Sequence, residues 1–440
     1  MVYQKKQVIL MNEKKLDTKQ ILISGFALFA IFFGAGNLIF PPFLGLNAGD
    51  GWFLASVGFN LSDSLLILLG TLAISVRSAN LNAFGAKVSR NFGKILSLIC
   101  ITLVGPLLSI PRTGATTFEI GVVPFYPNFN KVLFSLVFFA LVYILTINGS
   151  KVIDRVGKYL TPILLLILAV LIIKGIAYPN MSLESLPGNK LSLGFIEGYQ
   201  TMDSLGPVFT TSIILNDFRN KGITKQDDLI KATIYSGLIA VVGLVIVYTG
   251  LTYIGAKSIA FANRDMTRTD LFISIAENIL GRNVQVALSL VVGFACLSTA
   301  IGLLSSFATT FSESLPRFSY KFYVRLGVVV SFILSILGVD KIMEISIPIL
   351  LFIYPIVISL YILNLIDRGN IDSLVYKITI VGVGLTSFAD SISALGFDNN
   401  FYVNAINKLP LANSGFSFVF MFVLCLILGL IFTRNKKRID

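Results

Sequence analysis

The first apolar run of the chain contains the stretch that decides the fold, Phe33-Gly34-Ala35-Gly36-Asn37-Leu38-Ile39-Phe40-Pro41-Pro42. Inside a helix, each glycine costs roughly 1 kcal/mol relative to alanine, and each proline removes a backbone hydrogen-bond donor. If the run crosses a membrane, the backbone groups freed by such an interruption must face a cavity or a ligand. The stretch therefore predicts a helix that is broken at membrane depth.

A second apolar run is interrupted in a similar way, in Gly194-Phe195-Ile196-Glu197-Gly198-Tyr199-Gln200-Thr201-Met202-Asp203-Ser204-Leu205-Gly206-Pro207. The two interrupted runs are expected to be spans one and six. Because they lie an odd number of spans apart, related halves that begin with them would be inverted relative to each other. Broken segments at matching positions of two halves indicate a transport site near the bilayer midplane.

The remainder of the chain has the composition of a membrane protein. Of its 440 residues, 55% are hydrophobic and 13% are charged, whereas a soluble domain carries about 25% charged residues. A spanning helix needs roughly 20 mostly apolar residues, and the long continuous runs do not fit the alternating strands of a barrel. We therefore expect an all-α integral membrane protein with about twelve transmembrane helices, over residues 20–43, 51–76, 95–118, 132–148, 159–178, 194–215, 232–254, 284–311, 324–339, 344–364, 375–396 and 415–433.

The distribution of positive charge predicts the orientation. Most of the 35 lysines and arginines fall in segments on the side of the N-terminus, and such an excess marks the cytoplasmic side. Both tails, residues 1–19 and 434–440, are therefore expected in the cytoplasm. The net charge of +12 is then explained by topology and by contact with the lipid bilayer, so we expect no nucleic-acid partner.

Several enzyme classes are excluded by composition. The chain has no histidine, and its three cysteines are far apart in apolar runs. Histidine relays, histidine-bound metals and serine–histidine catalysis are therefore excluded, and no catalytic residues and no cofactor are expected. No obligate protein partner is evident either.

The glycines of the first break favour a ligand site over helix packing. The N–H groups and the dipole of an opened helix suit a carboxylate, and its carbonyl oxygens suit an ammonium group or Na⁺. An isolated Gly34-Ala35-Gly36 motif would favour a small-residue packing face. Pro41, Pro42 and the second break reverse that preference.

Three charged residues are candidates to act in transport. A carboxylate within a span costs roughly 2.5–3.5 kcal/mol on insertion scales, so Asp203 should face a cavity or a partner. It could balance a substrate ammonium group, pair with a basic residue, or lie in water near a membrane edge. Arg112 and Glu119 are seven residues apart and share a helix face. A pair of Arg112 with Glu119 or with Asp203 could form a gate, or be a static ion pair near the outer interface with Glu119 in the loop.

Other polar residues in the spans leave their roles open. Ser298 and Thr299 could offer hydroxyl oxygens to Na⁺, or could bond back to the preceding helical turn. Asp63 and Asp390 could each bind a proton or make a packed polar contact.

Four motifs together resemble one known family, the bacterial branched-chain amino acid:cation symporters of the amino acid–polyamine–organocation superfamily. The resemblance extends over essentially the whole chain, in the expected order. The motifs are Phe33-Gly34-Ala35-Gly36-Asn37-Leu38-Ile39-Phe40-Pro41-Pro42, Gly105-Pro106 with Ile110-Pro111-Arg112-Thr113, Gly198-Tyr199-Gln200-Thr201-Met202-Asp203-Ser204-Leu205, and Ala295-Cys296-Leu297-Ser298-Thr299-Ala300-Ile301-Gly302.

The resemblance implies a leucine-transporter-like fold in a single polytopic domain of the bacterial cytoplasmic membrane. Residues 20–178 would form the first inverted repeat, residues 194–364 the second, and residues 375–433 two additional helices. Residues 34–37 and 199–204 would bind the substrate, with the amides of Ala35 and Gly36 on its carboxylate. A Na⁺ ion would take carbonyl oxygens of Ala30, Phe33 and Ala295 and hydroxyl oxygens of Ser298 and Thr299. The resemblance assigns no role to Arg112 or Asp203.

The expected activity is uptake of leucine, isoleucine and valine together with Na⁺, or alternatively with H⁺. A channel would need a polar stripe repeated through several spans, but the polar residues gather at the two breaks. A membrane-embedded enzyme would need a catalytic cluster that the chain does not offer. A different neutral amino acid as substrate stays open.

Overall fold

The computed structural model describes residues 18–34, 36–76, 84–147, 152–178, 183–220, 223, 225–367, 369–398 and 400–439. Within these ranges the regular elements are all helical. They are α2 (Thr18–Phe32), α3 (Gly36–Ala48), η1 (Gly49–Gly51), α4 (Trp52–Asn60), η2 (Leu61–Leu65), α5 (Leu66–Val76), α7 (Phe92–Thr102), η3 (Leu103–Leu107), α8 (Ser109–Gly121), α9 (Lys131–Ile147), α10 (Val152–Ala177), α11 (Lys190–Tyr199), η4 (Asp203–Leu205), α12 (Pro207–Asn220), α13 (Gln226–Lys257), η5 (Ser258–Ala260), α14 (Arg268–Leu280), α15 (Arg282–Ser314), α16 (Tyr320–Ser335), α17 (Val339–Ile366), α18 (Ser373–Ala394), α19 (Phe401–Ile406), η6 (Ala412–Ser414) and α20 (Ser417–Ile439).

Each apolar run predicted from the sequence coincides with one helix or with a helix that is interrupted. Seven of the helical stretches in the described residues are long and apolar enough to cross a membrane. Among the shorter apolar helices are Lys131–Ile147 and Ile163–Ala177. The all-α fold and its broken helices are thus present, whereas the count of about twelve spans stays a prediction.

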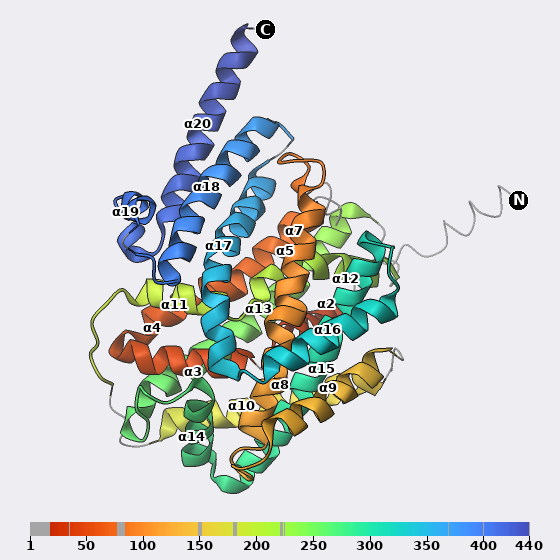
Figure 1. The fold of residues 1–440 in the computed structure, drawn as a ribbon, viewed down its shortest axis with the longest axis vertical. Coiled ribbons are helices and arrows are strands. Elements are labelled where there is room, and N and C mark those ends of the chain that lie inside the picture. Colours follow the sequence, from red (N-terminus) through yellow and green to blue (C-terminus); the bar gives the residue numbers. More distant parts are fainter. Residues whose placement is uncertain are drawn as a thin grey trace, which may run out of the picture.

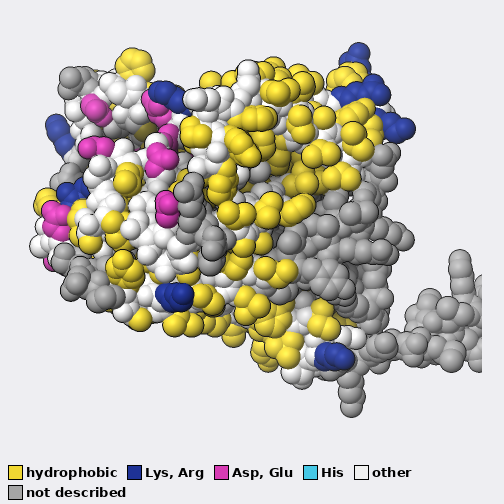
Figure 2. Space-filling model, turned by 90° about the horizontal axis from the view of Figure 1, so that it is seen from below, with side chains coloured by type: hydrophobic (Ala, Val, Ile, Leu, Met, Phe, Trp, Pro, Cys, Tyr) yellow, Lys and Arg dark blue, Asp and Glu magenta, His cyan; other side chains and the backbone are white. Residues whose placement is uncertain are grey.

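The outer surface of the helix bundle is apolar, as contact with lipid requires. Large hydrophobic side chains with more than half of their surface exposed include Phe26, Ile246, Leu290 and Val381. Figure 2 shows hydrophobic side chains over the middle of one face, with Asp and Glu gathered at its left end. A soluble monomer rarely exposes such a continuous apolar area.

Helices α3 and α11 are held in the middle of the bundle by close backbone packing. Helix α3 packs along α13, and α11 packs along α4 (Figure 1). A Cβ atom at Gly45 would overlap the carbonyl oxygen of Thr252, and one at Gly194 would overlap that of Ala55. Glycine at these two positions lets the broken helices approach their neighbours closely enough to fix the breaks in space.

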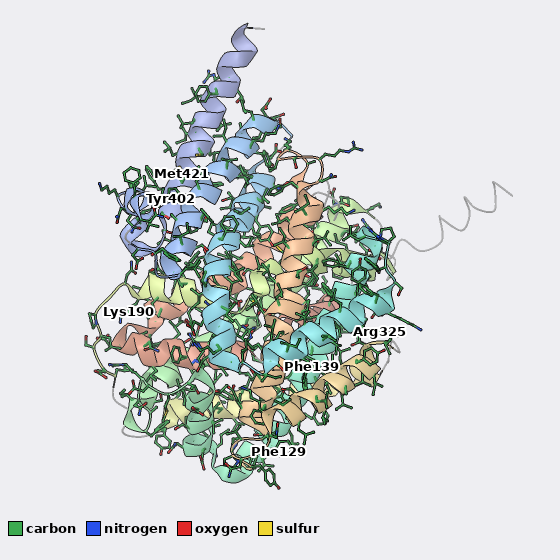
Figure 3. All side chains as sticks on the ribbon, in the orientation of Figure 1. Phe129, Phe139, Lys190, Arg325, Tyr402 and Met421 are labelled. Carbon is green, nitrogen blue, oxygen red and sulfur yellow. The ribbon has the colours of Figure 1, made fainter. Side chains whose placement is uncertain are left out.

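Helix α18 packs against both α17 and α20 on one side of the bundle, and α20 extends beyond it (Figure 1). A Cβ atom at Gly382 of α18 would overlap Cys425 and lie 3.3 Å from Cγ of Met421, both on α20 (Figure 3). Helices α18 and α20 correspond to the two additional helices expected at residues 375–433. Asp390 belongs to this region, where its Oδ2 accepts a 3.0 Å hydrogen bond from Ser417. That contact joins α18 to α20 outside the breaks.

Candidate substrate and cation site

The first predicted break lies between α2 and α3. Helix α2 ends at Phe32 and α3 begins at Gly36. The Gly34 N–H donates to the Phe32 carbonyl (3.1 Å), and the Asn37 N–H donates to the Gly34 carbonyl (3.2 Å). Tight local turns therefore pair part of the opened backbone. Ala35, which we expect to hold a carboxylate, lies outside the described residues.

The second predicted break separates α11 from α12. Helix α11 ends at Tyr199, the short 3₁₀ turn η4 follows, and α12 begins at Pro207. Met202 takes a left-handed conformation with φ of 68° although it is not glycine. Such a conformation is costly and persists only where the surroundings enforce it. Here the side chain is fully buried, and the Ser109 hydroxyl donates to its sulfur (3.2 Å).

The Asn37 side chain joins the two breaks. Its Nδ2 donates to the Phe32 carbonyl (2.7 Å) and to Oδ2 of Asp203 (2.5 Å). The hydroxyl oxygen of Tyr248, on α13, lies 2.5 Å from the same nitrogen. Asp203 therefore faces the first break and is held by a neutral amide, an outcome that the sequence left undecided.

Asp63 belongs to the same assembly, although the sequence leaves its role open. It lies in η2, a π-helical turn between α4 and α5, and is fully buried. The Thr201 hydroxyl donates to its Oδ1 (2.6 Å), and the Ser204 hydroxyl donates to the Ser62 carbonyl (2.7 Å). A π-turn inside an α-helix is often found at a functional site. Both Asp63 and Asp203 thus approach Thr201, whose hydroxyl lies 3.4 Å from the Asp203 amide nitrogen.

Arg112 reaches the breaks from α8 but forms neither of the ion pairs considered from the sequence. Within the described residues no ion pair connects it to Asp203 or Glu119. Its Nη1 donates to the Gln200 carbonyl (2.5 Å) and its Nη2 to the Thr201 carbonyl (3.2 Å). Carbonyl oxygens at the end of a helix carry partial negative charge, which a cation satisfies. The sequence does not predict this contact, because the acceptors are backbone carbonyl groups, which every residue carries.

Glu119 is directed away from Arg112. Its Oε2 accepts from the Thr269 hydroxyl (2.8 Å) and its Oε1 from the Val339 N–H (3.1 Å). A shared helix face places the Arg112 and Glu119 side chains on the same side of α8. The orientation of Glu119, however, is set by its hydrogen bonds to α14 and α17. The gate predicted at Arg112, Glu119 and Asp203 is therefore replaced in this conformation by other contacts.

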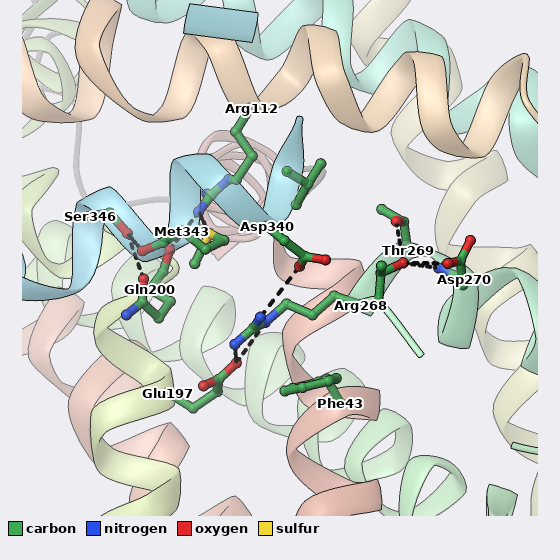
Figure 4. A network of polar contacts seen from close by, with 12 residues as sticks. Phe43, Arg112, Glu197, Gln200, Arg268, Thr269, Asp270, Asp340, Met343 and Ser346 are labelled. Carbon is green, nitrogen blue, oxygen red and sulfur yellow. Dashed lines mark hydrogen bonds and ion pairs between the residues drawn. The ribbon is translucent and has the colours of Figure 1, made fainter. Parts of the chain in front are cut away.

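Arg268, which the sequence did not single out, makes the ion pairs instead. It begins α14 and lies 3.1 Å from Oε1 of Glu197 on α11 and 3.5 Å from Oδ1 of Asp340 on α17 (Figure 4). Its guanidinium carbon also lies 4.2 Å from the ring centre of Phe43 on α3. One side chain thus connects α14 to both broken helices and to α17. We call Arg268, Glu197 and Asp340 the latch.

The residues expected to bind Na⁺ are partly brought together. A Cβ atom at Gly34 would lie 3.7 Å from Cγ2 and 3.8 Å from Oγ1 of Thr299, so Thr299 on α15 faces the first break. The hydroxyls of Thr210 and Thr211 bond back to the preceding turn, whereas the hydroxyls of Ser298 and Thr299 make no side-chain hydrogen bond among the described residues. A bond from these two hydroxyls to the preceding turn, the alternative considered from the sequence, is therefore not seen.

Aromatic side chains form one wall of the site. The Tyr199 ring stacks on Tyr354 of α17 with 4.1 Å between ring centres, and Phe195 packs edge-on against Tyr199. The hydroxyl groups of both tyrosines are buried and find no hydrogen-bond partner in the described part of the chain. Beside them, Oε1 of Gln200 accepts from the Ser346 hydroxyl (2.8 Å). Residues 199–204 therefore line the second break together.

Similar architectures occur in solved transporter structures. Mhp1, a nucleobase-cation-symport-1 family transporter in a closed conformation with bromovinylhydantoin bound, superposes with a TM-score of 0.59 at 16% identity, over 93% of this chain and 92% of that chain. MhsT in complex with L-phenylalanine superposes with a TM-score of 0.57 at 17% identity, over 96% of this chain and 98% of that chain. Such low identities establish the fold alone. The protein thus has a leucine-transporter-like fold.

The chain belongs to the branched-chain amino acid transport protein family, whose sequence pattern matches residues 17–436. It is 36% identical to the branched-chain amino acid permease BraB of Bacillus subtilis (strain 168), over 95% of this chain and 96% of that protein. It is 33% identical to the branched-chain amino acid permease BrnQ of the same organism, over 91% of this chain and 94% of that protein. These relatives are transporters rather than enzymes, as expected from the sequence.

Proposed function

We propose that this protein takes up leucine, isoleucine and valine across the bacterial cytoplasmic membrane by symport with a cation, with both of its termini in the cytoplasm. The observation that carries the proposal is the contact between Asn37 and Asp203, which joins two broken helices in a member of this family. The substrate would lie between residues 34–37 and 199–204. Its ammonium group would face Asp203, and its carboxylate would face the start of α3.

Cation coupling follows from the energetics of uptake. A membrane potential of 100 mV is worth about 2.3 kcal/mol per charge. A zwitterionic amino acid gains nothing from that potential unless a cation moves with it. An apolar pocket separates substrates that differ by one methylene by only about 1–3 kcal/mol, so overlap among the three branched amino acids is expected.

Na⁺ is the preferred coupling ion in this proposal. The ion would lie between the first break and α15, with carbonyl oxygens of Ala30, Phe33 and Ala295 and the hydroxyls of Ser298 and Thr299 as ligands. The support is the position of Thr299 beside Gly34 and the absence of competing hydrogen bonds on both hydroxyls in this part of the chain. A proton is the alternative, favoured by the fully buried carboxylate of Asp63 and the partly buried carboxylate of Asp203, which belong to the same polar assembly, because two neighbouring carboxylates can share one proton.

Alternating access requires the latch to open. Closure by Arg268, Glu197 and Asp340 holds α14 against both broken helices. Release of these ion pairs would admit the substrate from the side of α14, which is the outside in the proposed orientation.

The activity can be tested with purified protein in proteoliposomes. Radiolabelled leucine uptake would be measured under an inward Na⁺ gradient, under a proton gradient and with neither, with isoleucine, valine and alanine as unlabelled competitors. We expect accumulation under the Na⁺ gradient that isoleucine and valine block and alanine does not. Absence of leucine uptake under either gradient would contradict the proposed substrate.

The Na⁺ site has its own test. Alanine at both Ser298 and Thr299 removes two oxygen ligands, so we expect the Na⁺ concentration for half-maximal leucine uptake to rise about 10-fold. Alanine at both Thr210 and Thr211, whose hydroxyls bond to their own helix, is the matched control and should leave it unchanged. An unaltered Na⁺ dependence in the first variant would rule out these ligands.

A further inference from the structure

Arg112 carries a buried positive charge for which the described part of the protein supplies no direct counter-ion. Its side chain is 4% exposed. Asp203 is close enough for its charge to act on the guanidinium group, but its hydrogen bond goes to Asn37. The Arg112 guanidinium contacts two carbonyl oxygens, the Met343 sulfur at 3.7 Å and the Phe40 ring at 5.0 Å. Dipoles alone offset a buried charge less well than a paired anion does.

The guanidinium group lies against the first residue of α3. A Cβ atom at Gly36 would lie 2.7 Å from Cζ of Arg112 and would overlap its Nη2. Helix α3 is 13 residues long, and the N-terminus of a helix carries partial positive charge. Two positive groups therefore meet at the start of α3, an arrangement that attracts an anion.

A third donor is available on α17. Tyr354 is fully buried, and its hydroxyl has no hydrogen-bond partner among the described residues. Its ring stacks on Tyr199, one residue before Gln200, whose carbonyl oxygen accepts from Arg112. A buried hydroxyl without a partner costs free energy unless something else satisfies it. A bound ligand with oxygen acceptors would satisfy both the Tyr354 hydroxyl and the Arg112 N–H groups that bond no described residue.

We infer that Arg112 binds the carboxylate of the substrate amino acid, with the Tyr354 hydroxyl as an additional donor and the N-terminus of α3 on the other side. This inference rests on the proposed function and assigns one end of the substrate to a side chain on α8. Guanidinium and carboxylate groups match in a planar, two-bond geometry that an ammonium group does not reproduce. The other end of the zwitterion then faces Asp203 across the site.

The test compares leucine with leucinamide, in which a neutral amide replaces the carboxylate. Binding of both would be measured by competition against radiolabelled leucine, and directly by calorimetry, for the wild type and Arg112→Gln. We expect leucine affinity to fall about 10- to 100-fold in the variant, as for the loss of a charge-assisted hydrogen bond. Leucinamide affinity should change less than about 3-fold, so the preference for the carboxylate disappears. An equal loss for both ligands, or no loss, would overturn the inference.

Two further variants separate binding from folding. Tyr354→Phe keeps the ring that stacks on Tyr199 and should weaken leucine about 3- to 10-fold. It should weaken leucinamide less, because a hydroxyl bonds a charged carboxylate more strongly than a neutral amide; an equal effect on both would overturn the role of the hydroxyl. Arg325→Gln makes the same substitution at an exposed arginine on α16 (Figure 3) and should bind leucine as the wild type does. Failure of the wild type to bind leucine would instead defeat the proposed function, independently of Arg112.

Discussion

Two arginines show how differently the same side chain is used in this transporter. Arg112 is buried at the breaks and donates to backbone carbonyl oxygens. Arg268 is the first residue of α14 and lies between two carboxylates. The Arg268 and Glu197 side chains are 15% and 14% exposed, and that of Asp340 is 45% exposed. Ion pairs that water can reach are weak and can be exchanged during a transport cycle. A buried arginine without a direct anionic partner is instead ready for a ligand that brings the anion.

The largest effect that tests this comparison is expected at Gly36. Alanine there forces the Arg112 guanidinium away from the start of α3, and overpacking of this kind costs about 1–3 kcal/mol. Leucine affinity in a binding assay should therefore fall about 5- to 150-fold. Gly384→Ala on α18, outside the two breaks, is the control, because its Cβ atom would meet only Cδ1 of Ile356, at an ordinary 3.9 Å. If both variants bind leucine equally well, leucine binding does not require the contact between Arg112 and the start of α3.

A smaller effect is expected from Arg268→Gln, which removes the charge of the latch. Loss of two partly exposed ion pairs should shift the balance toward the state open at α14 by about 1 kcal/mol, or roughly 5-fold. Single-molecule energy transfer between dyes on exposed Asn278 of α14 and exposed Lys408 would measure that balance. Leucinamide and leucine should be affected alike, in contrast to Arg112→Gln. An unchanged distribution would mean that the latch does not hold the closed state.

The smallest effect should distinguish the two carboxylates of the latch. Glu197→Gln removes the closer and more buried partner of Arg268, and Asp340→Asn removes the more distant and more exposed one. Glu197→Gln should increase the fraction of molecules open at α14 more than Asp340→Asn does. We expect Asp340→Asn to change that fraction by less than about 2-fold. The same dye pair measures both. A larger shift for Asp340→Asn would show that exposure does not set the strength of these pairs.

A buried aspartate provides a contrast with both arginines. Asp367, just after α17, accepts a 2.5 Å hydrogen bond from Lys87. Burial would raise the pKa of the carboxyl, but bonds from Lys87, the N–H groups of Ile371 and Gly369, and Tyr376 hold that pKa well below its usual range. Because this pKa is depressed, the contact contributes stability above the pKa of an unfolded aspartate and loses it only as the pH falls through the native value.

Local sequence determined the class of the protein and the places where its helices break. Long apolar runs must form helices in lipid, because each backbone group needs an internal partner. The first break coincides with the glycines at residues 34 and 36, whereas Pro41 and Pro42 lie inside α3. The second break ends at Pro207, the first residue of α12, where a proline is well tolerated. These properties belong to short segments, so they can be recognised without knowing what packs against them.

Tertiary structure alone decided the partners of the charged residues. Arg112 and Gln200 are far apart in the sequence, as are Arg268 and Glu197, and Asp63 meets Thr201 across the bundle. Residue type and position in a span indicate the charge of a side chain and its depth in the membrane. The groups that the side chain contacts depend on how the helices cross and on backbone acceptors, which every residue carries. For that reason the sequence identified Arg112 and Asp203 as important yet could not assign their contacts, and it did not single out Arg268. The contacts of these charged residues are set by the packing of α8, α11, α14 and α17 around the two breaks.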